Sequence, residues 1–304
     1  MLKMKTVSVI IPTYKNRGGL LKSVDSALSQ DYPGLLEVII VDDNEPDSED
    51  RRSTITMMQK YSDNPKVVYI CHDRNKNGAA ARNTGINASK GDFIAFLDDD
   101  DLFLEGKLTK QVEYLEKHLE NKAVYCLARR CKYCVPQDVI EGNGTREILM
   151  LKSNFFTPSL MFYREALISI NGFDETFRRH QDYELLLRFF AAGFNIGCVP
   201  EVLIEIGSNQ GENILSGEKI DELKAYFFSK FKAFIEKEDE KTPGFLNEVY
   251  ANHYAGVFLS HIKTRNFRRA FRTFNKYFFK SPLAFSLIIY KHAKIHLTKS
   301  SIKK

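Results

Sequence analysis

The sequence predicts an α/β protein with a mostly parallel, mixed sheet flanked by helices, and a helical C-terminal extension. Four short apolar runs recur at intervals of about thirty residues over the first hundred residues, and segments with helical spacing separate them. Strands that alternate with helices form right-handed crossovers and therefore a parallel sheet. Beyond residue 215 the apolar spacing is mostly helical.

The predicted strands of the first half are runs of β-branched and aromatic residues that end at turns or charges. They cover 7–11, 38–41, 67–70 and 93–97, and Pro12 is expected to end the first of them. The predicted helices between them cover 20–30, 47–61 and 79–89.

Composition and cysteine usage favour a cytoplasmic protein that is long enough for a large globular domain. With 304 residues and 43% hydrophobic residues, the chain can form one large α/β domain, or a domain with an appendage. The five cysteines are an odd number without framework spacing, which favours reduced thiols in a cytosol. We expect neither a signal peptide nor a membrane span, because no apolar run approaches the roughly 18 residues that a span needs.

Charge is distributed unevenly along the chain. All 39 acidic residues lie within residues 1–248, which carry 32 basic residues, whereas the last 56 residues carry 12 basic residues and no acidic one. A mildly acidic body with a strongly basic tail predicts a polyanion or an anionic membrane as a partner.

Four consecutive carboxylates follow the predicted strand at 93–97, and no basic residue lies among them: Asp98, Asp99, Asp100 and Asp101. Repulsion makes this run unfavourable unless a cation compensates it. Mg²⁺ and Mn²⁺ prefer carboxylate oxygens, and Mg²⁺ usually binds through one or two carboxylates plus substrate phosphates. The alternative is a solvated acidic loop in which Asp101 caps the next helix.

Other polar side chains follow neighbouring strands, and open α/β sheets bind ligands at the carboxyl ends of their strands. Thr13 and Tyr14 follow the first strand, and Asp42 and Asp43 follow the second. Arg82 lies in the helix before the acidic strand, where it can reach a phosphate or hold the aspartates. Structural alternatives exist for these residues. Tyr14 can be a half-buried ring, Asp42 and Asp43 can form a turn, and Arg82 can form a structural ion pair. The sequence has no dinucleotide-binding GxGxxG and no P-loop.

Four segments together resemble the successive motifs of family 2 glycosyltransferases of the GT-A fold. They are VSVIIPTYKN at 7–16, VDDNEPD at 41–47, GAAARNTGINASKG at 78–91 and FLDDDD at 96–101. The resemblance covers roughly residues 5–205, in the family's order. It implies a catalytic domain over 1–215, with a nucleotide-sugar half at 1–102 and an acceptor half at 103–215, followed by a basic helical extension at 216–304.

The resemblance also implies a set of donor-site residues. Asp98 and Asp100 correspond to the DxD pair that holds Mn²⁺ or Mg²⁺, with Asp100 as the direct ligand and Asp98 nearer the ribose. Asp99 is the spacer between them and is included among the nucleotide-sugar contacts. The other positions that match family contacts to the nucleotide are Pro12, Thr13, Tyr14, Asp42, Asp43, Asn77 and Arg82.

The acceptor half is predicted to contain strands at 123–127 and 133–140, an apolar strand after 157–159, and a helix at 164–170. His180 to Leu185 resembles the family's Glu-Asp motif, with Gln181 in place of the glutamate. Asp182 is therefore our candidate general base, which must reach an acceptor hydroxyl. The alternative is that Asp182 and Glu184 are acids that favour a helix N-terminus.

One departure from the family concerns the metal site. The family often has a histidine after the strand that contains Val202, and here the following segment, Gly207 to Gln210, contains none. The third protein ligand is therefore not assigned.

The predicted reaction is the transfer of a single sugar, with inversion, from a nucleotide-sugar, with a UDP-sugar expected, to a glycan or lipid-linked glycan of a surface or capsular polysaccharide. The QxxRW motif and spans of processive members are absent. Two rival functions remain. One is a sugar nucleotidyltransferase, which would have a glycine-rich basic loop after the first strand; Lys15 to Gly19 resembles such a loop only weakly. The other is a non-catalytic membrane adaptor with the same fold.

The tail is predicted to form helices at 219–236, 246–262 and 267–279, and a last one after Pro282. In the third of these, phenylalanines at helical spacing alternate with arginines and lysines. Such a helix can lie on an anionic membrane, which would place the protein on the inner face of the cell membrane. It can also pack on the catalytic domain. No motif supports nucleic acid as a partner.

Overall fold

The computed structural model describes residues 4–15, 18–130, 133–135, 138–152, 155–177, 179–207 and 218–290. The chain divides into two compact units: residues 1–145 with 153–208, and residues 146–152 with 209–304. From the sequence we expected a boundary at 215. We did not predict that 146–152 belong with the C-terminal helices. Expectations that fall on 208–217 or 291–304 lie outside the described residues.

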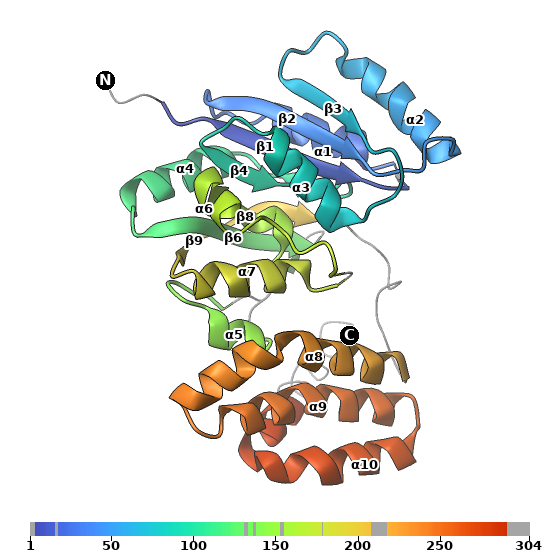
Figure 1. Ribbon diagram of the computed structural model, residues 1–304, viewed down its shortest axis with the longest axis vertical. Coiled ribbons are helices and arrows are strands. Elements are labelled where there is room, and N and C mark those ends of the chain that lie inside the picture. The colour runs from blue at the N-terminus through green and yellow to red at the C-terminus, as the bar shows by residue number, and fades with distance from the viewer. Residues whose placement is uncertain are drawn as a thin grey trace, which may run out of the picture. The chain divides into compact units, whose positions relative to one another are not determined.

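The first unit is built on one mixed sheet in the spatial order β3-β2-β1-β4-β8-β6-β9-β5, with β7 paired to β6 (Figure 1). Its first four positions pair in parallel, β8 is antiparallel to β4 and β6, and β6 pairs in parallel with β9. The strands are β1 (Val7–Thr13), β2 (Leu35–Asp42), β3 (Val67–Cys71), β4 (Phe93–Phe96), β5 (Leu102–Phe103), β6 (Asn121–Arg130), β7 (Tyr133–Cys134), β8 (Leu160–Tyr163) and β9 (Asn195–Ile206).

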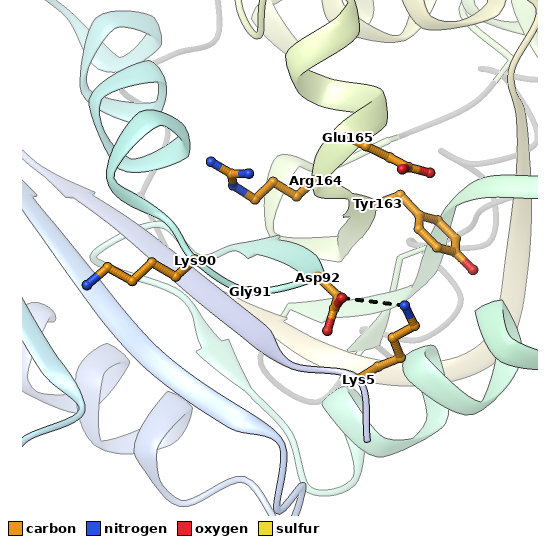
Figure 2. Close-up of a pocket in the computed structure, with 7 residues that line it drawn as sticks. All are labelled: Lys5, Lys90, Gly91, Asp92, Tyr163, Arg164 and Glu165. Carbon is orange, nitrogen blue, oxygen red and sulfur yellow. Dashed lines mark hydrogen bonds and ion pairs between the residues drawn. The ribbon is translucent and has the colours of Figure 1, made fainter. Parts of the chain in front are cut away.

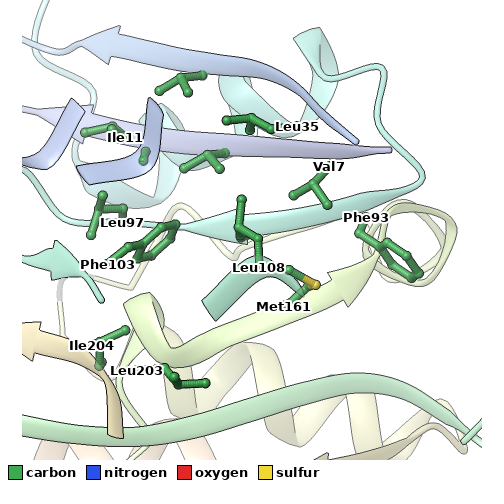
Figure 3. Close-up of a cluster of buried hydrophobic side chains, with 14 of the residues drawn as sticks. Val7, Ile11, Leu35, Phe93, Leu97, Phe103, Leu108, Met161, Leu203 and Ile204 are labelled. Atoms are coloured by element: carbon green, nitrogen blue, oxygen red, sulfur yellow. The ribbon is translucent and has the colours of Figure 1, made fainter. Parts of the chain in front are cut away.

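Helices cover both faces of this sheet because the strand residues alternate between two cores. Val9 and Val38 face a large core with α1 and α4, which Figure 3 shows in part, whereas Ile39 and Val41 face α3. The helices are α1 (Leu20–Leu28), α2 (Glu49–Met58), α3 (Gly78–Ala88), α4 (Lys107–Lys117), α6 (Arg164–Ser169) and α7 (Gln181–Ala191). This architecture confirms the α/β fold predicted from the sequence.

Two predicted strand boundaries were wrong. Pro12 does not end β1 but lies within it, opposite Val41. Pairing of β1 with β4 stops at Ile10, so the missing N–H of proline interrupts no ladder on that side. Of the strand expected at 133–140, the described residues form only β7, whereas Val135 and Asp138 to Ile140 are not in a strand and 136–137 lie outside the described residues.

The second unit is helical. Its helices are α8 (Glu218–Lys241), α9 (Phe245–Lys263), α10 (Phe267–Tyr277) and a last helix at 282–290. In Figure 1 α8, α9 and α10 lie side by side. The segment at 146–152 joins them through two buried side chains of α9: the Asn252 amide donates to the Met150 carbonyl, and His253 Nε2 lies 2.8 Å from the Leu149 carbonyl oxygen. Within the described residues, no helix is long and apolar enough to cross a membrane.

Candidate functional site

The polar residues identified in the sequence gather where β1, β2 and β4 end. Because these strands are parallel neighbours, Thr13, Asp42 and Asp98 are brought to the same edge of the sheet. Figure 2 shows a cavity of about 290 Å³ at the opposite edge, where β1 and β4 begin; it is lined by Lys5, Lys90, Gly91, Asp92, Tyr163, Arg164 and Glu165. That cavity is therefore not part of the candidate site.

Asp99 is held by the end of β1. The Thr13 hydroxyl donates to Asp99 Oδ2 over 2.6 Å, across 86 residues of sequence. Burial, with the charges of Asp98 and Asp100, raises the pKa of Asp99 to about 6. The backbone of Gly19, just before α1, approaches so closely that a Cβ there would lie 2.5 Å from the Asp99 carbonyl oxygen. Asp99 thus fixes the acidic run against β1 and α1.

Asp101 does not cap the next helix, which corrects the sequence-based expectation. The helix α4 begins six residues later, after Gly106. The Asp101 carboxylate is buried and accepts a 2.7 Å hydrogen bond from the backbone N–H of Gly207, the residue after β9. Burial and the neighbouring carboxylates raise the pKa of Asp101. The acidic run is therefore clamped between the start of α1 and the end of β9.

Arg82 connects the acidic run to the start of α7. From α3, its Nη2 donates to Asp98 Oδ1 over 2.6 Å and its Nη1 donates to Gln181 Oε1 over 2.9 Å. Gln181 is the first residue of α7, and its amide nitrogen donates to the Phe177 carbonyl oxygen. One guanidinium therefore spans the predicted DxD motif and the helix that carries Asp182.

Asp182 lies in the first turn of α7 and is partly buried. Burial raises the pKa of Asp182 to about 6, against the opposing effect of backbone N–H groups and of Arg82. Its Oδ1 lies 3.0 Å from the backbone nitrogen of Tyr183, which donates to it. A carboxylate with a pKa near 6 is ionised at neutral pH and is a stronger base than an ordinary aspartate.

The contacts of Asp42 indicate a role in stabilising the fold. Its side chain is fully buried, forms an ion pair with Arg51 Nε at 3.1 Å, and accepts from the Tyr69 hydroxyl at 2.5 Å and the Asn44 N–H at 2.9 Å. The Arg51 guanidinium also reaches the His72 carbonyl oxygen. We assign Asp42 to the framework of the site and leave it out of the proposed donor contacts.

Asp43 organises the loop before α3. It is buried and accepts from the backbone N–H groups of Lys76 and Asn77, while His72 Nδ1 lies 2.7 Å from its Oδ1. The sequence analysis missed both His72 and Arg51. No sequence motif marks either residue, because each contacts its aspartate across the boundary between two secondary-structure elements.

The remaining predicted contacts differ in accessibility. Asn77 has a positive φ of 89° and caps α3, where its side-chain oxygen accepts from the N–H groups of Ala79 and Ala80. Its side-chain nitrogen donates to the Glu175 carbonyl oxygen. Tyr14 is exposed beyond the end of β1, and Pro12 is partly buried in the strand.

The geometry of the edge can be compared with known proteins. The model of Glycosyl transferase family 2 matches residues 8–186, more than half of the chain. The protein belongs to this family. It is therefore a glycosyltransferase, and the resemblance inferred from the four motifs is confirmed.

Relatives agree with this assignment, and a solved structure shares the fold. The amylovoran biosynthesis glycosyltransferase AmsB of Erwinia amylovora is 28% identical over 218 residues, which cover 66% of this chain and 69% of that protein. An uncharacterized glycosyltransferase of Methanocaldococcus jannaschii is 26% identical over 238 residues, covering 74% and 78%. S. aureus TarS 1-349 in complex with UDP-GlcNAc has a TM-score of 0.65 and 16% identity, covering 93% of this chain and 83% of that chain. The shared fold is GT-A.

The family 2 metal site is the least complete part of the geometry. In the part of the chain that the structure describes, no three or more His, Cys, Asp or Glu side chains gather in a group that could hold a metal ion. The chemistry of Asp98 and Asp100 nevertheless fits Mg²⁺ or Mn²⁺, which can bind through two carboxylates and the phosphates of a substrate. One oxygen of Asp98 already accepts from Arg82. Direct coordination by Asp100 stays a prediction from the family resemblance.

Proposed function

We propose that this glycosyltransferase transfers a single sugar, with inversion, from a nucleotide-diphospho-sugar to an acceptor hydroxyl. The observation that carries the proposal is the contact of Arg82 with both Asp98 and Gln181. It links the donor-binding aspartates to the first turn of α7, where Asp182 lies. A donor held at the acidic run and a base one residue beyond Gln181 are the two parts that the reaction needs.

The donor is proposed to lie across the ends of β1 and β4. Thr13 fixes the acidic run through Asp99, and the exposed ring of Tyr14 offers a surface for a base or ribose. Asp100, with Asp98 beside it, would hold Mn²⁺ or Mg²⁺, which neutralises the leaving diphosphate. Because the TarS structure contains UDP-GlcNAc, UDP-sugars are the first donors to test.

Asp182 is proposed to act as the general base. The acceptor oxygen forms the new bond to the anomeric carbon as the bond from that carbon to the diphosphate breaks. The proton of the acceptor hydroxyl passes to the Asp182 carboxylate, and the nucleoside diphosphate leaves. A single displacement of this kind inverts the anomeric centre, because the hydroxyl and the diphosphate occupy opposite faces of the sugar.

The acceptor is proposed to be a glycan or lipid-linked glycan of a surface polysaccharide. The support is the name of the AmsB relative, which acts in amylovoran biosynthesis. The acceptor half would contribute α7 and the loop before it. In that loop the side-chain amide of Asn83 in α3 donates to the Phe173 carbonyl oxygen and accepts from the Phe173 N–H.

The donor proposal is tested with a panel of UDP-, GDP- and dTDP-sugars, each with and without Mn²⁺. We expect one nucleotide-sugar to raise the melting temperature in a Mn²⁺-dependent way and to release nucleoside diphosphate. Asp100→Ala should abolish both effects, whereas Asp63→Ala, an exposed aspartate far along the chain from the acidic run, should leave them unchanged.

Other outcomes distinguish the rival functions. Release of pyrophosphate from a nucleoside triphosphate and a sugar phosphate would assign a nucleotidyltransferase. If no nucleoside diphosphate raises the melting temperature in the presence of Mn²⁺, and no nucleoside diphosphate is released from any donor, the proposed donor site is contradicted. The non-catalytic adaptor would then be the remaining function.

A further inference from the structure

The helix α10 has one packed side and one side that carries both cations and exposed aromatic rings. Its packed side consists of Ala270, Thr273 and Tyr277, which are buried. On the other side, Phe267 is 63% exposed and Phe271 is 65% exposed, one helical turn apart. The exposed cations interleaved with these rings are Arg268, Arg272 and Lys276.

Two adjoining hollows share Arg272 and Lys276. The first is open and is lined by Arg268, Phe271 and Asn275 in addition to the shared cations. The second, of about 320 Å³, is lined in addition by Asp221, Tyr254, His261, Arg269, Thr273 and Tyr277. The second hollow is therefore lined by three cations, Arg269, Arg272 and Lys276, and by one carboxylate, Asp221. Asp221 pairs with Arg269 at 3.2 Å.

A buried polar atom also borders the second hollow. His261 is almost fully buried, and its Nε2 lies 3.3 Å from Asp221. Its Nδ1 has no hydrogen-bond partner among the described residues. The cations Arg269, Arg272 and Lys276, which line this hollow, suit an anionic oxygen ligand such as a phosphate group.

We propose that the outer side of α10 docks this enzyme on an anionic phospholipid bilayer. The rings of Phe267 and Phe271 would enter the boundary between headgroups and acyl chains, and the flanking cations would contact lipid phosphates. Charge complementarity supports this partner, because residues 249–304 carry 12 basic residues and no acidic one. The inference concerns the helical unit alone and goes beyond the proposed transfer reaction.

A lipid surface fits the exposed side chains better than a nucleic acid does. Nucleic acids bind to aromatic rings through base stacking, so the phenylalanines alone do not separate the two partners. The last described helix of the same unit exposes Leu283 by 73% and Leu287 by 56%. Leucine has no ring on which a base can stack, but it partitions into acyl chains. The apolar surface of this unit is therefore suited to lipid.

Vesicle co-sedimentation of the full chain tests the proposal. Vesicles contain either phosphatidylcholine alone or phosphatidylcholine with 30% phosphatidylglycerol, at 50 mM and 500 mM salt. We expect sedimentation with the anionic vesicles and not with the neutral ones, weakened at least tenfold by Arg268→Glu, Arg272→Glu and Lys276→Glu together. Replacing Phe267 and Phe271 with serine should weaken binding and increase its salt sensitivity, because the apolar contribution is lost.

A matched control changes the same amount of charge elsewhere. The exposed lysines 66, 90 and 117 lie in the first unit, and their replacement by glutamate should leave vesicle binding within twofold of wild type. The circular dichroism spectrum and the melting temperature confirm that each variant is folded. Equal binding of wild type and the α10 charge variant, or binding to a single-stranded oligonucleotide without binding to anionic vesicles, would overturn the proposal. Loss of donor turnover would leave this result unaffected.

Discussion

Arg82 donates from Nη2 to Asp98 Oδ1 over 2.6 Å, so a residue of α3 fixes a carboxylate that follows β4. The same guanidinium holds Gln181 at the start of α7. The acidic run and the start of α7 are thus joined by one side chain. Because residue 181 is a glutamine, the ion pair of this bridge is the one to Asp98, and the contact with Gln181 is a hydrogen bond.

Replacing Arg82 should uncouple the two halves. We expect Arg82→Ala to lower donor turnover by about 10- to 100-fold, since a charge-assisted hydrogen bond contributes about 1.5 to 3 kcal/mol. Arg82→Lys should retain part of the activity, because an ammonium keeps the charge but cannot reach two acceptors in the same fixed geometry. Turnover of nucleotide-sugar measures both. Wild-type turnover in the alanine variant would show that the bridge has no catalytic role.

Asp42 should matter for stability. Its fully buried carboxylate pairs with Arg51, and removing one partner of a buried ion pair costs about 3 to 5 kcal/mol. Asp42→Ala should therefore lower the melting temperature strongly, whereas the exposed Asp47→Ala in the same segment should not. If Asp42→Ala has wild-type stability and only loses nucleotide affinity, Asp42 is a donor contact after all.

The backbone at Gly207 should be intolerant of a side chain. A Cβ at this position would lie 2.4 Å from the Asp100 carbonyl oxygen and 3.2 Å from its carboxylate Oδ2. We expect Gly207→Ala to destabilise the protein by about 1 to 3 kcal/mol and to remove Mn²⁺-dependent stabilisation by the donor. Gly256→Ala in α9 is the control, because its Cβ meets no atom within 4 Å and alanine favours a helix. Equal donor responses of the two variants would show that the clamp on the acidic run is unnecessary.

The pH profile of turnover should show an acidic limb near pH 6. Burial raises the pKa of Asp182 to about 6, so the base is ionised above this pH and protonated below it. Activity should therefore fall as pH falls through 6. Asp99 has a similar pKa, so the profile is repeated with Asp99→Asn, which preserves an oxygen for Thr13. The limb should remain in that variant, and its disappearance would assign it to Asp99.

Much of the fold followed from local sequence patterns. The strands and helices of the first half are separated by turns and have clear periodicity, so their type and order could be predicted. The edge that gathers Thr13, Asp98 and Asp100 follows from the parallel topology. The confirmed family assignment depended on the same short motifs.

Long-range contacts set the limit of that prediction. The partner of Asp101 is Gly207, 106 residues away, so local sequence suggested a helix cap instead. Asp42 was predicted as a nucleotide-sugar contact, with a turn former as the alternative. Its contacts with Arg51 in the next helix and Tyr69 in the next strand were not predicted. The placement of 146–152 with the C-terminal helices depends on Asn252 and His253, which no local pattern connects to that segment.

The central claim is that donor binding at the acidic run and proton removal by Asp182 are separate functions of one site. It is tested most directly by measuring donor affinity and turnover in Asp182→Asn, with the nucleotide-sugar that stabilises the wild type most. We predict that Asp182→Asn binds the donor with unchanged affinity in the presence of Mn²⁺. Its transfer rate should fall by about 10²- to 10⁴-fold, the usual contribution of a general base. A transfer rate equal to that of wild type would contradict the account.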